Sequence, residues 1–182
     1  MTSFVTTVGR VLHLCEGLAL KLSAFLMIAL LALMNVEIAM RYVFGKSTLL
    51  ADEYGGYFYA WIVLLGAVHL LRSDKYLTVT LLTNRLSPSG RNAAALFAGI
   101  VGLAVSLISL ASTWSIVEMS WMFGSRSIQP SATPLLYPQL AMLLGYGLLS
   151  LAYVEEIVRR LLGMPPRRSD DDPETYGIGD IS

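Results

Sequence analysis

The stretch AAALFAGIVGLAVSLISLASTWSIV, residues 93–117, carries no ionisable side chain over 25 residues. About 20 consecutive apolar residues make a helix long enough to cross the hydrocarbon core of a membrane, which is about 30 Å thick. In the whole chain only 14% of the residues are charged, whereas an ordinary soluble domain has roughly 25%. The stretch therefore predicts a membrane-spanning helix.

Three further stretches have the same character. Residues 17–40 have an unbroken apolar centre, and neither 54–71 nor 135–154 contains an Asp, Glu, Lys or Arg. Together with the first stretch they take up nearly half of the chain, which leaves no room for a soluble domain of useful size. The sequence predicts an all-α integral membrane protein in which four transmembrane helices form one domain over residues 1–163.

The segments outside these stretches are of two kinds. Residues 4–15 place apolar side chains at spacings of three and four, which is typical of an amphipathic helix that lies in the membrane interface. The segment 72–91 between the second and third spans carries another apolar run and predicts a second interfacial helix. Residues 164–182 are charged and poor in apolar side chains, so we expect a disordered cytoplasmic tail.

The distribution of Lys and Arg predicts the orientation, because these residues are retained on the cytoplasmic side of short loops. Nine of them lie on the side of the spans that holds both chain ends, and three lie on the other side. The nine are Arg10, Arg72, Lys75, Arg85, Arg91, Arg159, Arg160, Arg167 and Arg168; the three are Arg41, Lys46 and Arg126. We therefore expect both termini in the cytoplasm.

Charged residues gather at the outer end of the first two spans, at Glu37, Arg41, Asp52 and Glu53. Glu37 and Arg41 are four residues apart on one helical face, which allows an ion pair, and Glu53 is the second choice of partner. One interpretation is that these charges hold the hairpin of the first two spans together. A second is that they form a docking surface for another protein, and a third is proton or ion transport through Glu37.

The remaining polar candidates predict little chemistry. Glu118, at the outer end of the third span, is expected to pair with Arg126, and both are further candidates for charges that stabilise the outer surface or dock a partner. Haem ligation by His13 and His69 would require both to lie at one depth and to face each other, so ordinary histidines are favoured. The sequence has no motif for nucleophilic catalysis, nucleotide binding or a metal cluster. It predicts neither an enzyme nor a bound metal or cofactor.

Small residues recur on three of the spans, where they allow helix backbones to approach closely in lipid. These candidate helix-packing positions are Gly56, Ala60, Gly66, Gly99, Gly102, Ala141 and Gly145. They are expected to serve contacts within the four-helix unit and also to suit a subunit that packs on a larger partner.

Two stretches, NVEIAMRYVFGKS (35–47) and ADEYGGYFYAWIVLLGAVHLLRSDKYLTV (51–79), resemble the small permease subunit of tripartite ATP-independent periplasmic (TRAP) transporters, the DctQ-like family. The shared elements are the RYVF end of the first span, the acidic pair that opens the second span, the end of that span at 65–72, and the outer loop SATPLLYPQ (131–139). The resemblance covers residues from about 35 to 153. The sequence departs from the family pattern at Lys75 and Tyr76, where a polar or histidine residue is usual.

The resemblance implies a three-part importer in the inner membrane of a bacterium. In such a system a soluble periplasmic protein captures an organic acid, and a large permease subunit of about twelve spans moves it with the energy of an ion gradient. The small subunit is expected to act as a scaffold for the large subunit and to contribute to the docking surface. The partners implied are therefore the large permease subunit, the periplasmic binding protein and lipids, with no nucleic acid.

Two other functions remain open from the residues. The first is a self-sufficient small four-helix multidrug-type antiporter, in which Glu37 would exchange protons for a cationic substrate. The second is a haem-bearing membrane redox protein that uses the two histidines. Transport by the purified chain alone would favour the first of these, and a coloured protein the second.

Overall fold

The computed structural model describes residues 2–72 and 88–163, and its helices are α1 (Thr2–Phe44), α2 (Leu50–Arg72), α4 (Pro88–Phe123) and α5 (Leu136–Leu161). Each is long and apolar enough to cross a membrane, as the sequence predicted for four spans. The helices extend beyond the predicted stretches; the third span, for example, covers Gly90–Phe123. Hydropathy detects only the apolar part of a helix, whereas hydrogen bonding continues into its polar ends.

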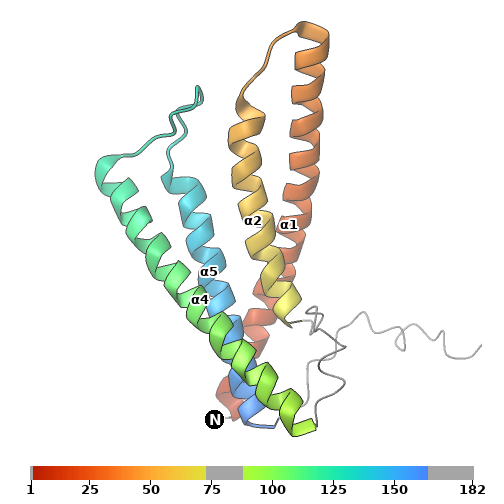
Figure 1. Ribbon diagram of the computed structural model, residues 1–182, viewed down its shortest axis with the longest axis vertical. Coiled ribbons are helices and arrows are strands. Elements are labelled where there is room, and N and C mark those ends of the chain that lie inside the picture. The colour runs from red at the N-terminus through yellow and green to blue at the C-terminus, as the bar shows by residue number, and fades with distance from the viewer. Residues whose placement is uncertain (1, 73–87, 164–182) are drawn as a thin grey trace, which may run out of the picture.

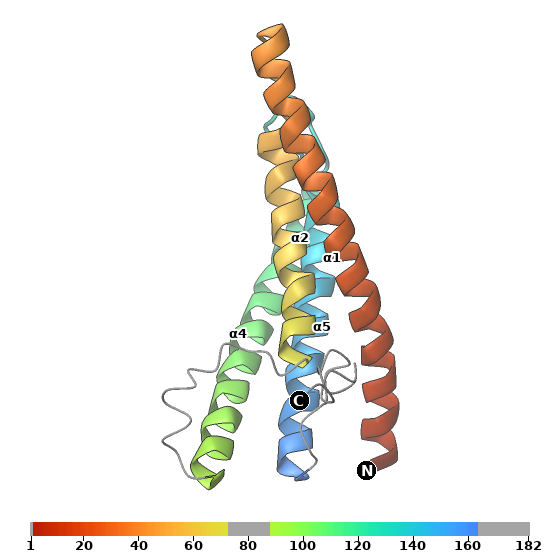
Figure 2. The ribbon, with the colours of Figure 1, turned by 90° about the vertical axis from the view of Figure 1, so that its right-hand side faces the viewer.

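The four helices form two antiparallel hairpins. The loop 45–49 joins α1 to α2, and the loop 124–135 joins α4 to α5. The hairpins meet mainly where α2 packs on α5, and the main neighbour of α4 is α5. Both loops lie at one end of the molecule, which we call the loop end, and the start of α1 and the end of α5 lie at the other, the terminal end (Figures 1 and 2). The hairpins diverge toward the loop end, where the α1–α2 loop stands beyond the α4–α5 loop (Figure 1).

The N-terminal segment differs from the prediction. Residues 4–15 are helical, but they are the first part of the continuous helix α1 and not a separate interfacial helix. No proline interrupts the 43 residues of α1, which at about 1.5 Å per residue make a helix about 65 Å long. The second predicted interfacial helix falls mainly on residues 73–87 and the predicted tail on 164–182, both outside the described residues.

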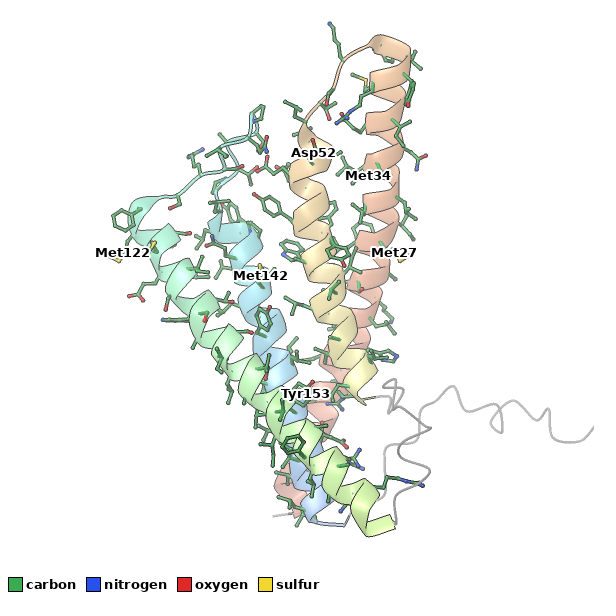
Figure 3. All side chains as sticks on the ribbon, in the orientation of Figure 1. Met27, Met34, Asp52, Met122, Met142 and Tyr153 are labelled. Carbon is green, nitrogen blue, oxygen red and sulfur yellow. The ribbon has the colours of Figure 1, made fainter. Side chains whose placement is uncertain are left out.

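Most of the predicted glycine positions lie at helix contacts. A Cβ atom on Gly145 of α5 would lie 3.0 Å from Leu64 Cβ of α2, and one on Gly99 of α4 would lie 3.3 Å from Ile157 of α5. Gly102 faces the ring of Tyr153, which lies where α4 crosses α5 (Figure 3). These close approaches are of the kind that small residues permit between helices in a membrane.

Gly56 makes no helix contact within the part of the chain that the structure describes, because no described atom lies within 4 Å of its Cβ position; its role in packing on a partner stays a prediction. Its neighbour Gly55 is the buried one, and a Cβ on Gly55 would meet Met34 of α1 at 2.9 Å. Adjacent residues of a helix point about 100° apart, so only one glycine of the pair can face α1. Gly66 makes an ordinary contact with Ser23, and Ala60 and Ala141 are half-buried.

Polar side chains between the helices find partners inside the protein. Ser23 of α1 donates to the Ile62 carbonyl of α2 at 3.2 Å, and Ser150 of α5 donates to Ser106 of α4 at 3.1 Å. The indole N–H of Trp61 in α2 donates to the Pro138 carbonyl of α5 at 3.1 Å. Because lipid offers no hydrogen bonds, such pairs favour one arrangement of the helices over others.

The contact between Gly145 and Leu64 provides a test of how the hairpins are joined. We expect Gly145→Val to lower the thermal stability of the protein in detergent, because the added side chain meets a Cβ that cannot move without its helix, and overpacking of this kind costs about 1–3 kcal/mol. Gly147→Val is the matched control, since Gly147 lies on the same helix and no atom of the described residues lies within 4 Å of its Cβ position. Equal melting temperatures for the two variants would contradict the packing described here.

Candidate functional site

At the loop end, the carboxylate of Glu37 holds the α1–α2 loop. Arg41 donates its Nε–H to Glu37 Oε1 at 2.7 Å, so the predicted ion pair is confirmed. The hydroxyls of Ser47 and Thr48 also donate to this carboxylate, and the backbone N–H of Thr48 donates at 3.1 Å. The buried carboxylate therefore folds the loop back onto the helix that precedes it, and Leu49 next to it has a φ of +58°.

The sequence predicts Glu53 as the second partner of Arg41, but the structure places Asp52 there instead. An Nη atom of Arg41 lies 3.7 Å from Asp52 Oδ2, and both side chains are at least half exposed. Figure 3 shows Asp52 at the loop end of α2. Asp52 and Glu53 are neighbours on a helix and point in different directions, which leaves Glu53 for the other hairpin.

The carboxylate of Glu53 holds the α4–α5 loop to α2. The Ser131 hydroxyl donates to Glu53 Oε2, and the Tyr57 hydroxyl donates to Oε1 at 3.0 Å. Ser131 Oγ also lies 2.8 Å from Thr133 Oγ1, which in turn lies 2.9 Å from the Tyr54 hydroxyl. Glu53 is buried, and these hydroxyls form a continuous hydrogen-bonded connection between the two hairpins.

The α4–α5 loop also has internal order. An isolated antiparallel bridge pairs Arg126 with Pro134, and the Ser127 N–H donates to the Thr133 carbonyl at 2.9 Å. Ala132 has a φ of +48°, a conformation that L-residues hold only when their surroundings impose it. The predicted proline-bearing turn is therefore a narrow folded loop with Ile128 fully exposed near its tip.

The expected pair between Glu118 and Arg126 is not formed among the described residues. The α4 helix ends at Phe123, and Gly124 follows with a φ of +57°, a left-handed conformation that ends the helix before Arg126. The guanidinium of Arg126 instead donates to the Ala132 carbonyl at 3.5 Å, inside its own loop. Glu118 is exposed on α4.

A buried ion network at the terminal end was missed by the sequence analysis. Arg72, at the end of α2, lies 2.8 Å from Glu16 of α1 and 2.7 Å from Glu155 of α5. The side chains of Arg72 and Glu155 are each only 3% exposed. His69, one helical turn before Arg72, places its Nδ1 atom 2.9 Å from Glu16 Oε1. This network connects three helices.

The sequence held a weak signal for this network. Arg72 had been counted among the cytoplasmic loop charges, but it lies on the same face of α2 as His69, one turn away. Glu155 directly follows the fourth predicted span, and Glu16 directly precedes the first. Pairing them required knowing that α2 lies between α1 and α5, which periodicity does not reveal. The side chain of His13, the other candidate haem ligand, lies outside the described ones.

Three carboxylates at the helix ends have each of their oxygens engaged by groups of this chain. Both oxygens of Glu37, Glu53 and Glu16 accept hydrogen bonds or pair with cations of this chain. Within the described residues, no group of three or more His, Cys, Asp or Glu side chains is arranged to hold a metal ion. The geometry suits carboxylates that fix loops and helices in place.

The network around Arg72 generates a stability prediction. We expect Arg72→Met to reduce sharply the amount of folded protein in the membrane, because removing one partner of a buried ion pair costs about 3–5 kcal/mol. The triple variant Glu16→Gln, Arg72→Met, Glu155→Gln should recover much of the loss, since no carboxylate is then left without its cation. Arg160→Met is the control, as Arg160 pairs with Glu156 on the same helix with both side chains partly exposed. The melting temperature in detergent is measured for all three variants. A triple variant whose melting temperature falls as far as that of Arg72→Met would contradict this account.

Comparisons with known proteins agree with the four-helix layout. The family model described as the DctQ component of tripartite ATP-independent periplasmic transporters matches residues 18–163. A protein of Haemophilus influenzae described as a TRAP transporter small permease protein is 29% identical over 101 residues, 53% of this chain and 58% of the relative. The C4-dicarboxylate TRAP transporter small permease protein DctQ of Vibrio cholerae is 31% identical over 118 residues, 62% of this chain and 51% of the relative.

The matched regions thus span little more than half the length of these two curated relatives. The family model, in contrast, covers all four spanning helices, from the first turns of the membrane part of α1 to the end of α5. It includes both carboxylate-held loops and Glu155 of the buried network. The chain belongs to the DctQ family of TRAP transporter components.

Proposed function

We propose that this chain is the small membrane subunit of a TRAP-type secondary importer of organic acids, which works with a large permease subunit and a periplasmic binding protein. Membership of the DctQ family supports the subunit role. The name of the Vibrio cholerae relative, which specifies C4-dicarboxylates, supports carboxylates as the substrate class. In this proposal the other subunits determine which acid is transported and which ion drives the transport.

We further propose that the protein lies in a bacterial inner membrane with both termini in the cytoplasm. The start of α1 and the end of α5 lie at the same end of the bundle (Figure 2). Arg72 is now a buried network residue, so eight Lys and Arg residues flank the spans on the terminal side and three on the loop side. That asymmetry still supports a cytoplasmic terminal end and a periplasmic loop end.

The observation that carries the scaffold role is the state of the two loop-end carboxylates. Glu37 is the acid that a proton antiporter would use, yet Arg41, Ser47 and Thr48 occupy its oxygens. Glu53 is likewise engaged by Ser131 and Tyr57. A carboxylate that exchanges protons with a substrate must lose its partners in each cycle, whereas one that shapes a loop keeps them. This favours a subunit that presents a fixed surface over a self-sufficient antiporter.

Reconstitution would test the proposal directly. The chain is reconstituted in proteoliposomes with a large TRAP permease subunit, a periplasmic binding protein is added outside, and uptake of labelled C4-dicarboxylates and other organic acids is measured under an ion gradient. We expect uptake only when all three proteins are present, and none with this chain alone. Transport of a cationic dye by this chain alone, lost in Glu37→Gln, would instead support the antiporter.

A single substitution probes the α4–α5 loop within that system. We expect Glu53→Lys to impair uptake while leaving membrane insertion intact, because a lysine cannot accept the hydroxyl hydrogen bonds of Ser131 and Tyr57 and the loop is released. Glu118→Lys makes the same charge change at an exposed site and should leave uptake unchanged. Wild-type uptake by a correctly assembled Glu53→Lys complex would count against a role for this loop.

A further inference from the structure

The carboxylates buried in the described part of the chain differ in how their charge is balanced. Glu37 lies 2.7 Å from the guanidinium of Arg41, and Glu155 lies 2.7 Å from that of Arg72. Glu53 is buried to a similar degree, with 7% of its surface exposed, but no Lys, Arg or His side chain among the described residues forms an ion pair with it. A buried charge without a counter-ion is strongly unfavourable. Of these three carboxylates, Glu53 is therefore the one whose charge the chain leaves unbalanced.

Hydroxyl groups surround Glu53 where the other two carboxylates have a guanidinium. The Tyr57 hydroxyl donates to Oε1 at 3.0 Å, and the Ser131 hydroxyl donates to Oε2. Behind them, Thr133 Oγ1 lies 2.8 Å from Ser131 Oγ, and the Tyr54 hydroxyl lies 2.9 Å from Thr133 Oγ1. Glu53 also lies in the first turn of α2, where the helix dipole supplies partial positive charge. These partial charges lower the cost of burial, but they do not neutralise the carboxylate.

The cluster formed by Glu53, Tyr54, Tyr57, Ser131 and Thr133, which we call the Glu53 cluster, presents only oxygen atoms. Hard cations such as the alkali and alkaline-earth ions prefer oxygen ligands. A hydroxyl group rotates about its C–O bond, so it can donate to the carboxylate when the site is empty or turn a lone pair toward a bound cation. The Glu53 cluster can therefore satisfy its polar groups in both states.

The charge and the spacing of the Glu53 cluster indicate which cation it fits. It has one carboxylate, and one carboxylate balances a monovalent ion. Calcium and zinc sites gather several carboxylate, His or Cys ligands, and the described part of the chain holds no such group. Neighbouring hydroxyl oxygens lie only 2.8 to 2.9 Å apart, which favours a small cation over a large one.

We propose that the Glu53 cluster is a binding site for a monovalent cation, with Na⁺ as the best fit. Glu53 supplies the charge, and the hydroxyl oxygens of Tyr57, Ser131 and Thr133 supply neutral ligands. Glu53 and Tyr57 belong to α2, whereas Ser131 and Thr133 belong to the α4–α5 loop. A bound cation therefore fastens the loop of one hairpin to the first turns of the other. The site lies wholly within this chain, so its occupation depends neither on a large permease subunit nor on a binding protein.

Thermal melting of the purified chain in detergent tests for the cation. Na⁺, K⁺ and choline chlorides are compared at equal ionic strength. We expect saturating Na⁺ to raise the melting temperature by about 5 °C or more relative to choline, because a ligand that binds only the folded state stabilises it by mass action. K⁺ should raise it less. Glu53→Gln should abolish the difference between Na⁺ and choline, whereas Glu118→Gln, which changes an exposed carboxylate of α4, should keep it.

Direct binding of radioactive ²²Na⁺ to the same protein gives a second readout. We expect about one saturable site per chain. Ser131→Ala combined with Thr133→Val keeps the carboxylate and removes two hydroxyl ligands, so it should weaken Na⁺ binding by about tenfold or more. This variant also keeps the test decisive if Glu53→Gln does not fold. Glu118→Gln should bind ²²Na⁺ as the wild type does.

Three results would overturn the proposal. The first is an equal rise in melting temperature with Na⁺, K⁺ and choline, which would reflect ionic strength. The second is ²²Na⁺ binding that is unchanged in both the Glu53 variant and the double hydroxyl variant, which would place the ion elsewhere. The third is an absence of saturable ²²Na⁺ binding to the folded wild-type chain, which would leave the hydroxyls and the helix dipole as the whole compensation for Glu53.

Discussion

Arg72 lies between two carboxylates in a part of the protein from which water is largely excluded. A guanidinium there is tolerated only with partners close at hand, and Glu16 at 2.8 Å and Glu155 at 2.7 Å supply them from the helices on either side. The three residues fix which helices are neighbours and at what relative height they stand. The Gly145 contact with Leu64 and the Trp61 bond to the Pro138 carbonyl follow along the same seam between α2 and α5.

Buried charges also need close partners at the loop end of the bundle. There the buried charges are carboxylates, and their partners are mainly hydroxyls and backbone groups of the two loops. Glu37 orders the loop that follows its own helix, whereas Glu53 binds the loop of the other hairpin through Ser131. Hydrogen bonds to the buried carboxylates thus give this membrane protein two ordered loops at the same end of the bundle.

The sequence was sufficient for the parts of the fold that depend on local properties. The four apolar stretches predicted the four spans, and the spacing of Glu37 and Arg41 predicted their ion pair, because both follow from helix geometry alone. Residue pairs that depend on which helices are neighbours were not accessible. Arg72 follows an apolar stretch, and for that reason the sequence predicts a loop residue there. Glu53 is a predicted partner of Arg41 because the sequence does not show how α2 is rotated about its axis. The burial of Gly55 against α1 depends on that rotation too, and the loop conformation that holds Arg126 near the Ala132 carbonyl and not near Glu118 could not be foreseen from spacing.

The division into two hairpins has a consequence for biogenesis. Each hairpin closes through contacts between helices that are adjacent in the chain, so α1 and α2 can associate in the membrane while the rest is still being translated. At that stage Arg72 already has Glu16, but Glu155 is 83 residues further along the chain and has yet to be made. The second carboxylate arrives with α5 and joins the hairpins. The ion network is therefore complete only after α5 has been inserted, and until then Arg72 lacks the carboxylate of Glu155.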